Sequence, residues 1–300
     1  MGSRSYLAIV NPAAGGGRCG RMCHAALEEL RSHGIAVALR ETSAAGEATE
    51  IARRAAQDGV RHFIAVGGDG TSYEIVNGLF PLLGGDESPT LGFLPLGTGN
   101  SFLRDFTQDG VSFARRAMIE DRVRPCDVLR LRHRDGVLHY INLLSIGFVA
   151  DVNGRRARRY QRWGEAGYVA AVLTEVAALA SRPFPLSIEG AEFDREPMVF
   201  ASFNNSRFTG GKMMMAPEAD TADGLIDFIR VAPLSRFDLL RTFPKIFKGT
   251  HTQNPAVTTK KVRHVRFELD EPIDVMVDGE ALEVVPLELD VLPGALRVHV

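Results

Sequence analysis

A cluster of glycines around one aspartate is the part of the sequence best suited to chemistry. Gly67-Gly68-Asp69-Gly70-Thr71 follows the apolar run at residues 63–66. Adjacent glycines let the backbone turn sharply and bring its N–H groups against phosphate oxygens. Asp69 can hold water or Mg²⁺ among the phosphates, or orient a reacting hydroxyl, and Thr71 can cap the next helix or bind a phosphate oxygen. The motif predicts a phosphate-binding turn, with a packing turn that binds no ligand as the alternative.

Two further loops have the same character. Residues 11–15 (Asn-Pro-Ala-Ala-Gly) follow the apolar run 6–10, and residues 97–100 (Gly-Thr-Gly-Asn) follow the run 91–96. Helix-like segments at 22–30, 46–57 and 72–79 alternate with these runs, which is the pattern of a parallel sheet with helical crossovers. Ligands of such sheets bind at the carboxyl ends of the strands. We therefore expect the three loops at one rim, around one ligand.

Two common nucleotide-binding motifs are absent. Gly15 and Gly20 have the spacing of a lysine-type phosphate loop, but Arg21 and Met22 follow where that motif needs Lys and Ser or Thr. The dinucleotide fingerprint also fails after the first strand, because its glycine spacing differs and Glu41 is the single acid at the end of the second strand.

The second half of the chain has a different pattern. Short apolar runs at 128–132, 139–146, 186–188, 198–204, 225–231, 262–269, 273–277, 287–291 and 295–300 are separated by Gly, Pro and Asp, and helices are expected at 155–180 and 237–247. Many short strands with such breaks are typical of an antiparallel sandwich or barrel. The sequence thus predicts an α/β domain with a parallel sheet over residues 1–127 and an antiparallel β-sandwich domain over residues 128–293.

Composition excludes several classes of protein. A formal net charge of −2 over 300 residues argues against general nucleic-acid binding, which needs a basic footprint. Three cysteines form neither a disulfide framework nor a zinc pattern and indicate reduced thiols in a cytoplasmic protein. The longest apolar stretch, residues 168–180, is interrupted by Thr174 and Glu175, so no membrane span is expected. Charge is segregated, however: the charged residues between 230 and 266 are mostly basic, and those between 268 and 300 are mostly acidic.

The motifs, taken in order, resemble the diacylglycerol kinase catalytic-domain family, which includes diacylglycerol, sphingosine and ceramide kinases and soluble bacterial lipid kinases. The resemblance rests on residues 11–15, 67–71 and 97–100, on Glu-Ile-Val-Asn-Gly at 74–78, on Asp-Gly-Leu-Ile-Asp at 223–227 and on Asp-Gly-Glu at 278–280. It covers most of the chain. The glycine motif at 67–71 alone is shared with NAD kinases, whereas the Asn-Pro opening together with the Asp-Gly-Glu ending is more specific to lipid kinases.

The resemblance implies a nucleotide-binding first domain, a lipid-acceptor second domain and an active-site cleft between them, with residues 294–300 returning to the first domain. It implies ATP as co-substrate and Mg²⁺ as cofactor. Glu280 would be the general base, with Asp69 as a second catalytic residue. Asp223 would bind Mg²⁺ with the backbone carbonyls of Asp220 and Leu225. The expected nucleotide-binding residues are Asn11, Pro12, Ala13, Ala14, Gly15, Thr42, Gly67, Gly68, Asp69, Gly70, Thr71, Ser72, Tyr73, Glu74, Thr98 and Asn100.

Two positions depart from the family pattern. Ser72-Tyr73 stands where relatives have an aliphatic residue and Asn or His, and Ser101 follows Asn100 where an Asp is usual. That Asp is expected to join a Mg²⁺–water network with Asp69 in relatives, so its replacement puts the catalytic metal arrangement in question. Without the resemblance, Asp278-Gly279-Glu280 would be interpreted as an ordinary acidic hairpin and Asp223-Gly224 as a common turn.

A lipid kinase without a membrane span must contact the bilayer surface. Arg155, Arg156, Arg158, Arg159 and Arg162 surround Tyr160 and Trp163, and Phe243, Lys245, Phe247 and Lys248 form a second basic and aromatic set. Basic residues attract anionic headgroups, and aromatic rings favour interfaces. The alternative is a solvated helix face whose aromatic side chains are anchored in the core, and for the second set this alternative is the favoured interpretation. We expect a transient contact with an anionic membrane at its inner face.

The sequence supports one main hypothesis and leaves two others open. The main one is an ATP-dependent kinase that phosphorylates a hydroxyl of a lipid alcohol such as diacylglycerol. The second is a soluble-substrate kinase of the NAD kinase type, which shares the loop at 67–71. The third, motivated by Ser101, is a non-catalytic regulator that binds a nucleotide or a lipid. The acceptor lipid and the oligomeric state, a homodimer included, stay open.

Overall fold

The computed structural model describes residues 5–80, 88–147 and 181–300. The described residues form two compact units. The first runs to Val128 and takes in Thr221–Asp223 and Leu292–Val300; the second contains the rest. Each unit is described by itself below.

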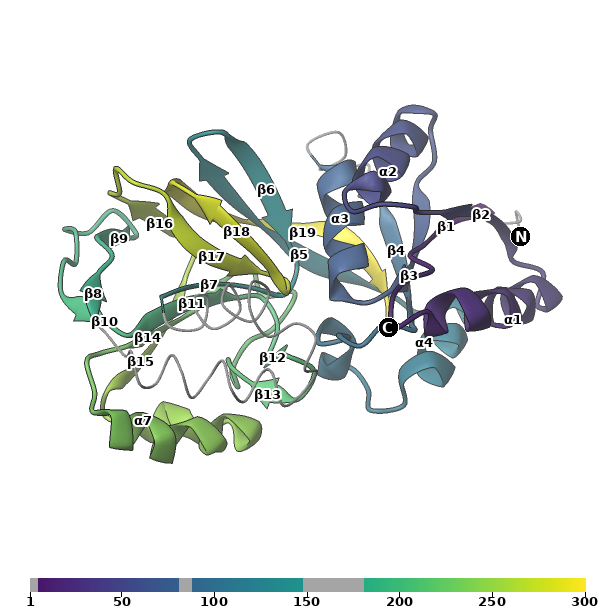
Figure 1. Ribbon diagram of the computed structural model, residues 1–300. Coiled ribbons are helices and arrows are strands. Elements are labelled where there is room, and N and C mark those ends of the chain that lie inside the picture. The colour runs from purple at the N-terminus through teal and green to yellow at the C-terminus, as the bar shows by residue number, and fades with distance from the viewer. Residues whose placement is uncertain (1–4, 81–87, 148–180) are drawn as a thin grey trace. The chain divides into compact units, whose positions relative to one another are not determined.

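The first unit is built on a parallel sheet (Figure 1). The strand order is β2 (Ala36–Glu41), β1 (Ser5–Val10), β3 (His62–Gly67), β4 (Thr90–Pro95) and the C-terminal part of β19 (Pro286–His299). All neighbouring pairs are parallel, including β19 with β4, where Arg297 faces Thr90. The expected α/β fold with a parallel sheet is confirmed.

Helices cover both faces of this sheet. They are α1 (Arg18–Ser32), α2 (Glu47–Gln57), α3 (Asp69–Leu79) and α4 (Gly110–Ile119), with a short 3₁₀ helix η2 at Phe102–Asp105. Leu27 and Leu30 of α1 and Met118 of α4 are buried in one cluster with Val10 and Val66. Helices α2 and α3 lie together on the other side of the sheet (Figure 1). Strands β1, β3 and β4 are accordingly near-continuous apolar runs that are buried on both faces of the sheet.

Two helices of this unit begin earlier than the sequence predicts. The helix expected at 22–30 is α1, which begins at Arg18. Helix α3 was expected from Ser72, but it begins at Asp69. Gly68 is the residue before the helix, in an extended conformation, and no side chain caps it. The prediction that Thr71 caps the helix is therefore wrong. Asp69, Gly70 and Thr71 form the first helical turn. The Asp69 N–H donates to the Gly99 carbonyl and the Thr71 N–H to the Gly68 carbonyl, so of these three only the Gly70 N–H lacks a partner among the described residues.

The second unit contains two antiparallel sheets. The first has the order β15 (Val257–Val262), β14 (Ile226–Val231), β11 (Phe200–Asn204), β7 (Leu143–Gly147), β17 (Ile273–Val277) and β18 (Glu280–Val284). The second contains β9 (Leu186–Ile188), β16 (His264–Phe267), the start of β19, β5 (Val123–His133) and β6 (Gly136–Tyr140). Two short pairs complete the unit, namely β8 (Arg182–Pro183) with β10 (Pro197–Met198) and β12 (Phe208–Thr209) with β13 (Met213–Met214).

Aromatic packing joins the two sheets. Phe203 of β11 meets Phe267 of β16 edge-on, with ring centroids 5.6 Å apart, and stacks on Phe228 of β14 at 5.2 Å. The Tyr140 hydroxyl of β6 donates to the Phe203 carbonyl at 3.3 Å. Rings from both sheets thus fill one core, as in a sandwich. The predicted antiparallel β-sandwich is confirmed.

Several predicted elements of this unit are divided or joined differently. The run 139–146 is split between β6 and β7, and the run 262–269 contains β16 alone. Strand β15, which was not predicted, ends at Val262 and belongs to the other sheet. The runs 287–291 and 295–300 lie in one strand, β19, within which Gly294 takes a left-handed φ of 59° and donates its N–H to Asp127. The helix expected at 237–247 is α7 (Arg236–Thr242) followed by the 3₁₀ helix η5 (Phe243–Lys248), since Pro244 lacks the N–H that would continue α7.

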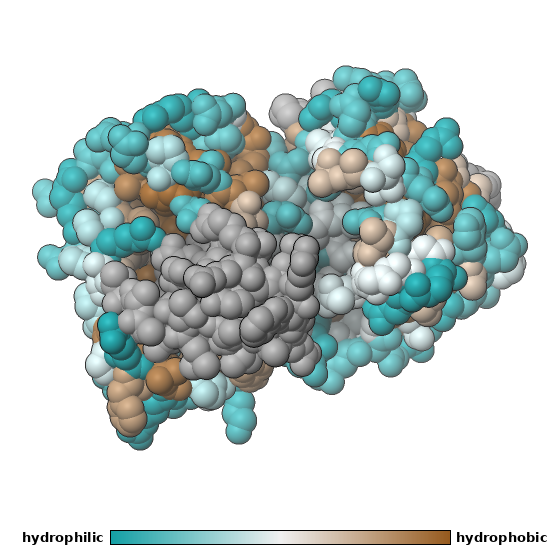
Figure 2. All heavy atoms as spheres, viewed as in Figure 1, coloured by the Kyte–Doolittle hydropathy of each residue, from teal (hydrophilic) through white to brown (hydrophobic). Residues whose placement is uncertain are grey.

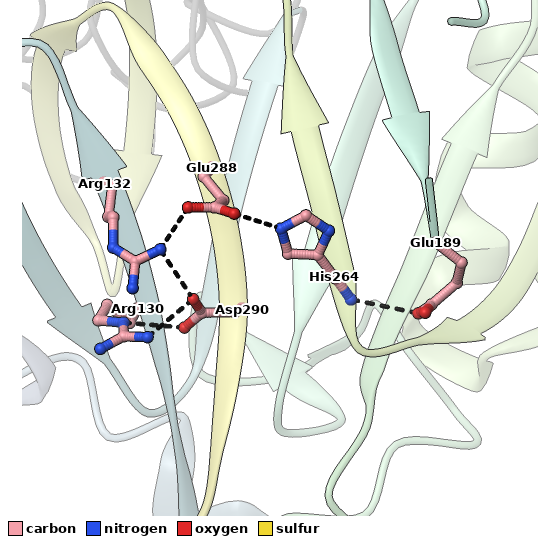
Figure 3. Close-up of polar contacts among 6 residues, drawn as sticks. All are labelled: Arg130, Arg132, Glu189, His264, Glu288 and Asp290. Carbon is pink, nitrogen blue, oxygen red and sulfur yellow. Dashed lines mark hydrogen bonds and ion pairs between the residues drawn. The ribbon is translucent and has the colours of Figure 1, made fainter. Parts of the chain in front are cut away.

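A charged network on β5, β19 and β16 explains part of the charge segregation (Figure 3). Arg130 donates to both carboxylate oxygens of Asp290 at 2.9 Å. Arg132 bridges Asp290 at 3.4 Å and Glu288, and Glu288 in turn pairs with His264. The pKa of Glu288 is lowered by the His264 and Arg132 hydrogen bonds. Two acids of the acidic C-terminal stretch are therefore neutralised within the second unit.

Candidate functional site

Two loops of the first unit are interlocked at the carboxyl ends of β3 and β4. The Gly97 N–H donates to the Gly67 carbonyl at 2.7 Å, and the Asp69 N–H donates to the Gly99 carbonyl at 3.0 Å. A Cβ atom on Gly97 would lie 2.7 Å from the Gly68 nitrogen, and one on Gly68 would lie 2.6 Å from the Gly99 carbonyl oxygen. Backbone approaches backbone here so closely that a side chain would have no room. The glycine spacing therefore fixes the geometry of the rim.

Asp69 is held at the centre of this contact. Both of its carboxylate oxygens accept the Ser101 N–H at 2.9 Å. Burial of the carboxylate raises its pKa, and hydrogen bonds from the Ser101 backbone and side chain partly oppose this. Ser101 is buried, at 1% exposure. The residue that departs from the family pattern thus supports the aspartate through hydrogen bonds, which is a role that a serine can fill.

The loop at residues 11–17 is joined to the same rim. The Asn11 N–H donates to the Val66 carbonyl at 3.1 Å, and the Asn11 side chain accepts the Ala13 N–H at 3.1 Å. The Arg18 guanidinium, in the first turn of α1, donates to the Leu96 carbonyl at 3.0 and 3.1 Å and to the Gly97 carbonyl at 2.9 Å. The structure therefore brings the three predicted loops together, as expected from their places at strand ends.

The remaining predicted nucleotide-binding residues are not all placed alike. Thr42 follows β2 and donates its N–H to the Val10 carbonyl at 2.8 Å, which puts it beside the first loop. Asn100 donates its side-chain amide to the Gly97 carbonyl at 3.0 Å, and Thr98 is exposed on the same loop. Thr71 and Ser72 are buried in the first turn of α3.

Glu74 and Tyr73 lie further along α3. The Glu74 carboxylate accepts the Gly46 N–H at 2.9 Å and the Ala48 N–H at 3.0 Å. It therefore satisfies donors at the N-terminus of α2, where a negative charge is favourable. Tyr73 is half-buried, and its carbonyl accepts the Asn77 side-chain amide at 2.9 Å. In the described contacts, Glu74 joins two helices of the first unit.

Little free space lies beneath the interlocked loops. A cavity of about 10 Å³ is lined by Gly67, Gly68, Asp69, Asn100 and Phe102, among others. This volume holds about one water molecule. The space beneath the loops is therefore too small for a nucleotide.

The Asp-Gly-Glu motif of the second unit is a tight hairpin with a buried acid. Val277 at the end of β17 faces Glu280 at the start of β18, so Asp278 and Gly279 are the two loop residues. Both have left-handed φ angles, 47° and 94°, as in a type I′ turn. The Asp278 side chain is 3% exposed, whereas Glu280 is exposed. This burial distinguishes the motif from an ordinary acidic hairpin, whose carboxylates would both face solvent.

Three backbone N–H groups hold the Asp278 carboxylate. They belong to Ile141, Asn142 and Leu143 at the corner between β6 and β7, and the distances are 3.1, 3.1 and 2.9 Å. The Asp278 N–H donates in return to the Leu143 carbonyl at 3.0 Å. Hydrogen bonds to a carboxylate are stronger than those between neutral groups. The hairpin that carries Glu280 is consequently fixed in position by a buried charge.

The corner itself is held by more polar side chains. Asn205 donates its side-chain amide to the Ile141 carbonyl at 2.8 Å and its backbone N–H to the Asn142 carbonyl at 2.8 Å. Ser206 donates its hydroxyl to the Asn142 side chain. All three polar residues are buried, at 0–3% exposure. A buried polar network of this kind fixes one conformation because each group loses a partner if the corner moves.

The predicted Mg²⁺ ligands lie in and beside the turn at residues 221–224. Asp223 is half-buried and Asp220 is exposed, and Leu225 precedes β14. Gly224 reverses the chain with a left-handed φ of 70°. One carboxylate and two backbone carbonyls are oxygen donors, which suit Mg²⁺. The donor set therefore fits the ion that the family pattern implies.

Asp127 holds two other segments of the first unit, at Thr221 and at Gly294. Its N–H donates to the Thr221 carbonyl at 2.7 Å, and its carboxylate accepts the Gly294 N–H at 2.7 Å. The Asp127 side chain is 1% exposed.

The described residues also bring ligand atoms of Cys23, His24 and Glu41 within 4.8 Å of one another. Burial raises the pKa of the Cys23 thiol, which disfavours the thiolate that a metal needs, so we assign no metal to this group.

Four residues with direct roles in this geometry were not singled out from the sequence for those roles: Arg18, Ser101, Asp127 and Asp278. Arg18 and Asp127 act through contacts with residues far along the chain, which no local motif reveals. Asp278 belongs to a motif that was noticed, but its burial depends on β6 and β7.

The basic and aromatic set at residues 155–163 lies outside the described residues. None of the described helices is long and apolar enough to span a bilayer.

Comparisons with known proteins agree on both units. Residues 5–131 match the diacylglycerol kinase catalytic domain, and residues 142–300 match the YegS C-terminal NAD kinase beta sandwich-like domain. A diacylglycerol kinase of Mycobacterium tuberculosis (strain ATCC 25618 / H37Rv) is 31% identical over 294 residues, which are 97% of this chain and 93% of that protein.

Two solved structures share the fold. A diacylglycerol kinase from Bacillus anthracis superposes with a TM-score of 0.72 at 22% identity, covering 100% of this chain and 97% of the other. An NAD kinase from Archaeoglobus fulgidus in complex with ATP superposes with a TM-score of 0.51 at 15% identity, covering 98% and 93%. At such identities the likeness concerns the fold alone.

Proposed function

Because the chain belongs to the diacylglycerol kinase family, we propose that it is an ATP-dependent lipid kinase that phosphorylates a hydroxyl of a lipid alcohol such as diacylglycerol. The observation that carries the proposal is the pair of interlocked glycine loops around the Asp69 carboxylate. Phosphoryl transfer depends mainly on positioning and on stabilising charge. The loops provide both, as a rigid backbone rim that ends in the first turn of a helix.

The ATP phosphates would bind to this rim. The Gly70 N–H, in the first turn of α3, would donate to a phosphate oxygen, and the helix adds its positive end. The loop at 11–15, Thr42, Thr98 and Asn100 would complete the nucleotide site. Mg²⁺ held by Asp223 and the carbonyls of Asp220 and Leu225 would be structural, and Mg²⁺ bound with ATP neutralises phosphate charge. Asp69 would orient that ion's water ligands through its fixed carboxylate.

Glu280 would act as the general base. The acceptor hydroxyl oxygen attacks the γ-phosphorus, so that a new O–P bond forms and the bond to the bridging β–γ oxygen breaks. ADP leaves, and the hydroxyl proton passes to the Glu280 carboxylate. Glu280 is exposed at the start of β18, and the buried Asp278 fixes its backbone. An exposed base on a rigid hairpin suits an acceptor that enters from outside.

A test in cells identifies the acceptor. Lipids from cells that express the chain are compared by mass spectrometry with lipids from cells that express Glu280→Gln. We expect one phosphorylated lipid class, such as phosphatidic acid, to rise with the wild-type chain only. Glu283→Gln, on the same strand and also exposed to solvent, is the matched control and should behave as wild type. No change in any phosphorylated lipid would contradict the proposal.

A test in solution separates the alternatives. The purified chain is given ATP, Mg²⁺ and, in turn, micelles of diacylglycerol, a sphingoid base or phosphatidylglycerol, and then NAD. Labelled lipid supports the proposal. Formation of NADP without labelled lipid would favour the soluble-substrate kinase, and tight ATP binding without turnover on any acceptor would favour a non-catalytic regulator.

A further inference from the structure

Helices α7 and η5 expose large apolar side chains on their outer face. Phe237 is 72% exposed, Leu240 46% and Phe247 51%. The inner face is already occupied, because Leu239 and Ile246 are buried in the core of the second unit. The sequence pattern favoured aromatic core anchors for this segment, and for Phe247 this interpretation is wrong. Figure 2 shows apolar surface at the lower left, where Figure 1 places α7.

Basic residues surround these three apolar side chains. Arg236, Arg241, Lys245 and Lys248 are all exposed, and none makes an ion pair within the described part of the chain. Asp238 is the one acid between residues 236 and 248, and it accepts the Ser235 hydroxyl at 2.7 Å. The segment therefore presents a net positive charge together with exposed rings.

The segment is held rigidly in this orientation. Ser235 caps α7 by accepting the Asp238 N–H at 3.1 Å. Asn254 donates to the Thr242 hydroxyl at 2.7 Å, at the junction of α7 and η5. Further along, the short helix η6 (Thr250–Gln253) is fixed by a 3.0 Å hydrogen bond between His251 and the Met215 carbonyl. The apolar face is thus preformed, and little ordering would be needed when it binds a surface.

We propose that Phe237, Leu240 and Phe247, with Arg236, Arg241, Lys245 and Lys248, form a docking patch for an anionic phospholipid bilayer. Apolar side chains that enter the acyl boundary, flanked by cations that meet lipid phosphates, are the two features of an interfacial helix. Exposed phenylalanine and leucine favour the bilayer over a nucleic acid, which would require neither. The purpose of the patch rests on the proposed function, because a diacylglycerol acceptor resides in a membrane.

Vesicle binding tests the patch without turnover. The full chain is sedimented with vesicles of phosphatidylcholine alone and of phosphatidylcholine with phosphatidylglycerol. We expect binding to the anionic vesicles that weakens as salt is raised. Phe237→Ser with Phe247→Ser should weaken it by about 100-fold, at roughly tenfold for each ring removed. Lys245→Glu with Lys248→Glu should weaken it by more than about 25-fold, at about fivefold for each cation lost.

Matched variants control for general effects. Leu287→Ser removes another exposed apolar side chain of the second unit, and Lys260→Glu with Arg263→Glu reverses two exposed cations elsewhere. Both should bind anionic vesicles as wild type does. The proposal is overturned if the patch variants bind as wild type, or if they bind no worse than the control variants. It is also overturned if sedimentation velocity shows a wild-type dimer that the Phe237 and Phe247 variant loses.

A second readout separates this proposal from the proposed function. With a short-chain diacylglycerol dispersed as monomers, the patch variants should phosphorylate the acceptor at the wild-type rate, while their rate on vesicles falls in parallel with binding. Equal losses on both forms of the acceptor would overturn the docking role. Vesicle binding through the patch without kinase activity on any acceptor would contradict the proposed function and leave the docking patch supported.

Discussion

Replacement of Gly97 by alanine tests whether the close approach of two loops builds the rim. A Cβ at this position would lie 2.7 Å from the Gly68 nitrogen, 2.8 Å from the Gly68 Cα and 2.9 Å from the Gly67 carbonyl carbon. Ordinary contact begins at 3.4 Å, so the loops would have to separate by about 0.7 Å to relieve the 2.7 Å contact. That movement weakens the hydrogen bonds Gly97 N–H to Gly67 O and Asp69 N–H to Gly99 O.

The expected loss can be estimated from these contacts. Overpacking at a rigid site costs about 1–3 kcal/mol, and two weakened hydrogen bonds add about 1 kcal/mol each. The first unit should therefore lose about 3–5 kcal/mol of unfolding free energy, which lowers its Tm by about 6–20 °C. Because the rim that we propose as the phosphate site is displaced, ATP affinity should fall as well, by at least about tenfold.

Urea denaturation and titration calorimetry with ATP measure the two effects. Gly34→Ala is the matched control: its φ is +80°, with no heavy atom within 4 Å of a Cβ, so the variant carries backbone strain of about 1–2 kcal/mol but meets no neighbour. It should bind ATP as wild type does. The reasoning is refuted if Gly97→Ala is no less stable than Gly34→Ala, or if it binds ATP normally.

Three other predictions follow from buried titratable groups. Asp69→Asn should abolish turnover yet raise the unfolding free energy at pH 7, because burial disfavours the ionised Asp69 in the folded state and raises its pKa. This gain in unfolding free energy should shrink as the pH falls through the raised pKa. Urea denaturation at several pH values checks this, and a loss of stability would contradict it. Asp278→Asn should lower kcat by at least about tenfold, since one amide oxygen cannot accept from the three backbone N–H groups that the carboxylate binds. Added to Glu280→Gln, Asp278→Asn should lower kcat no further, and additive losses would assign Asp278 a purely structural role. Burial lowers the pKa of His139 to about 4. Between pH 6.5 and 4 the unfolded chain takes up a proton that the folded chain does not, so up to about 3 kcal/mol of unfolding free energy should be lost over that range. In chemical denaturation His139→Gln should show a smaller loss, and an unchanged loss would exclude this origin.

The site at the strand ends of the first unit could be predicted from the sequence because its glycine motifs are local in the chain. Glycines at three strand ends predicted one site, since the carboxyl ends of parallel strands meet at one edge. What the sequence could not reveal is the contact itself: Gly97 meets Gly67 and Gly68, and Arg18 reaches Leu96, through pairings set by the sheet. The register of β3 and β4, rather than any motif, decides which atoms touch.

For the second unit, the sequence predicted the antiparallel sandwich but not the bounds of every strand or the burial of every side chain. The physical reasons differ between elements. Strand β15 was missed because its residues Thr258–Lys261 are polar and exposed, so no apolar run marks it. Asp278 was noticed as a turn residue, but its buried charge is satisfied by N–H groups some 135 residues earlier in the chain. Phe247 was assigned to a core on composition, whereas Leu239 and Ile246 occupy that core.

Isotope transfer into lipid tests the central claim most directly. The purified chain is incubated with γ-labelled ATP, Mg²⁺ and diacylglycerol in mixed micelles, and labelled lipid and ADP are counted together. We predict phosphatidic acid that carries one label for each ADP formed, a rate lower by about 10²–10⁴-fold in Glu280→Gln with unchanged ATP affinity, and a wild-type rate in Glu283→Gln. ADP formed without labelled lipid, or labelled lipid formed equally well by Glu280→Gln, would contradict the account.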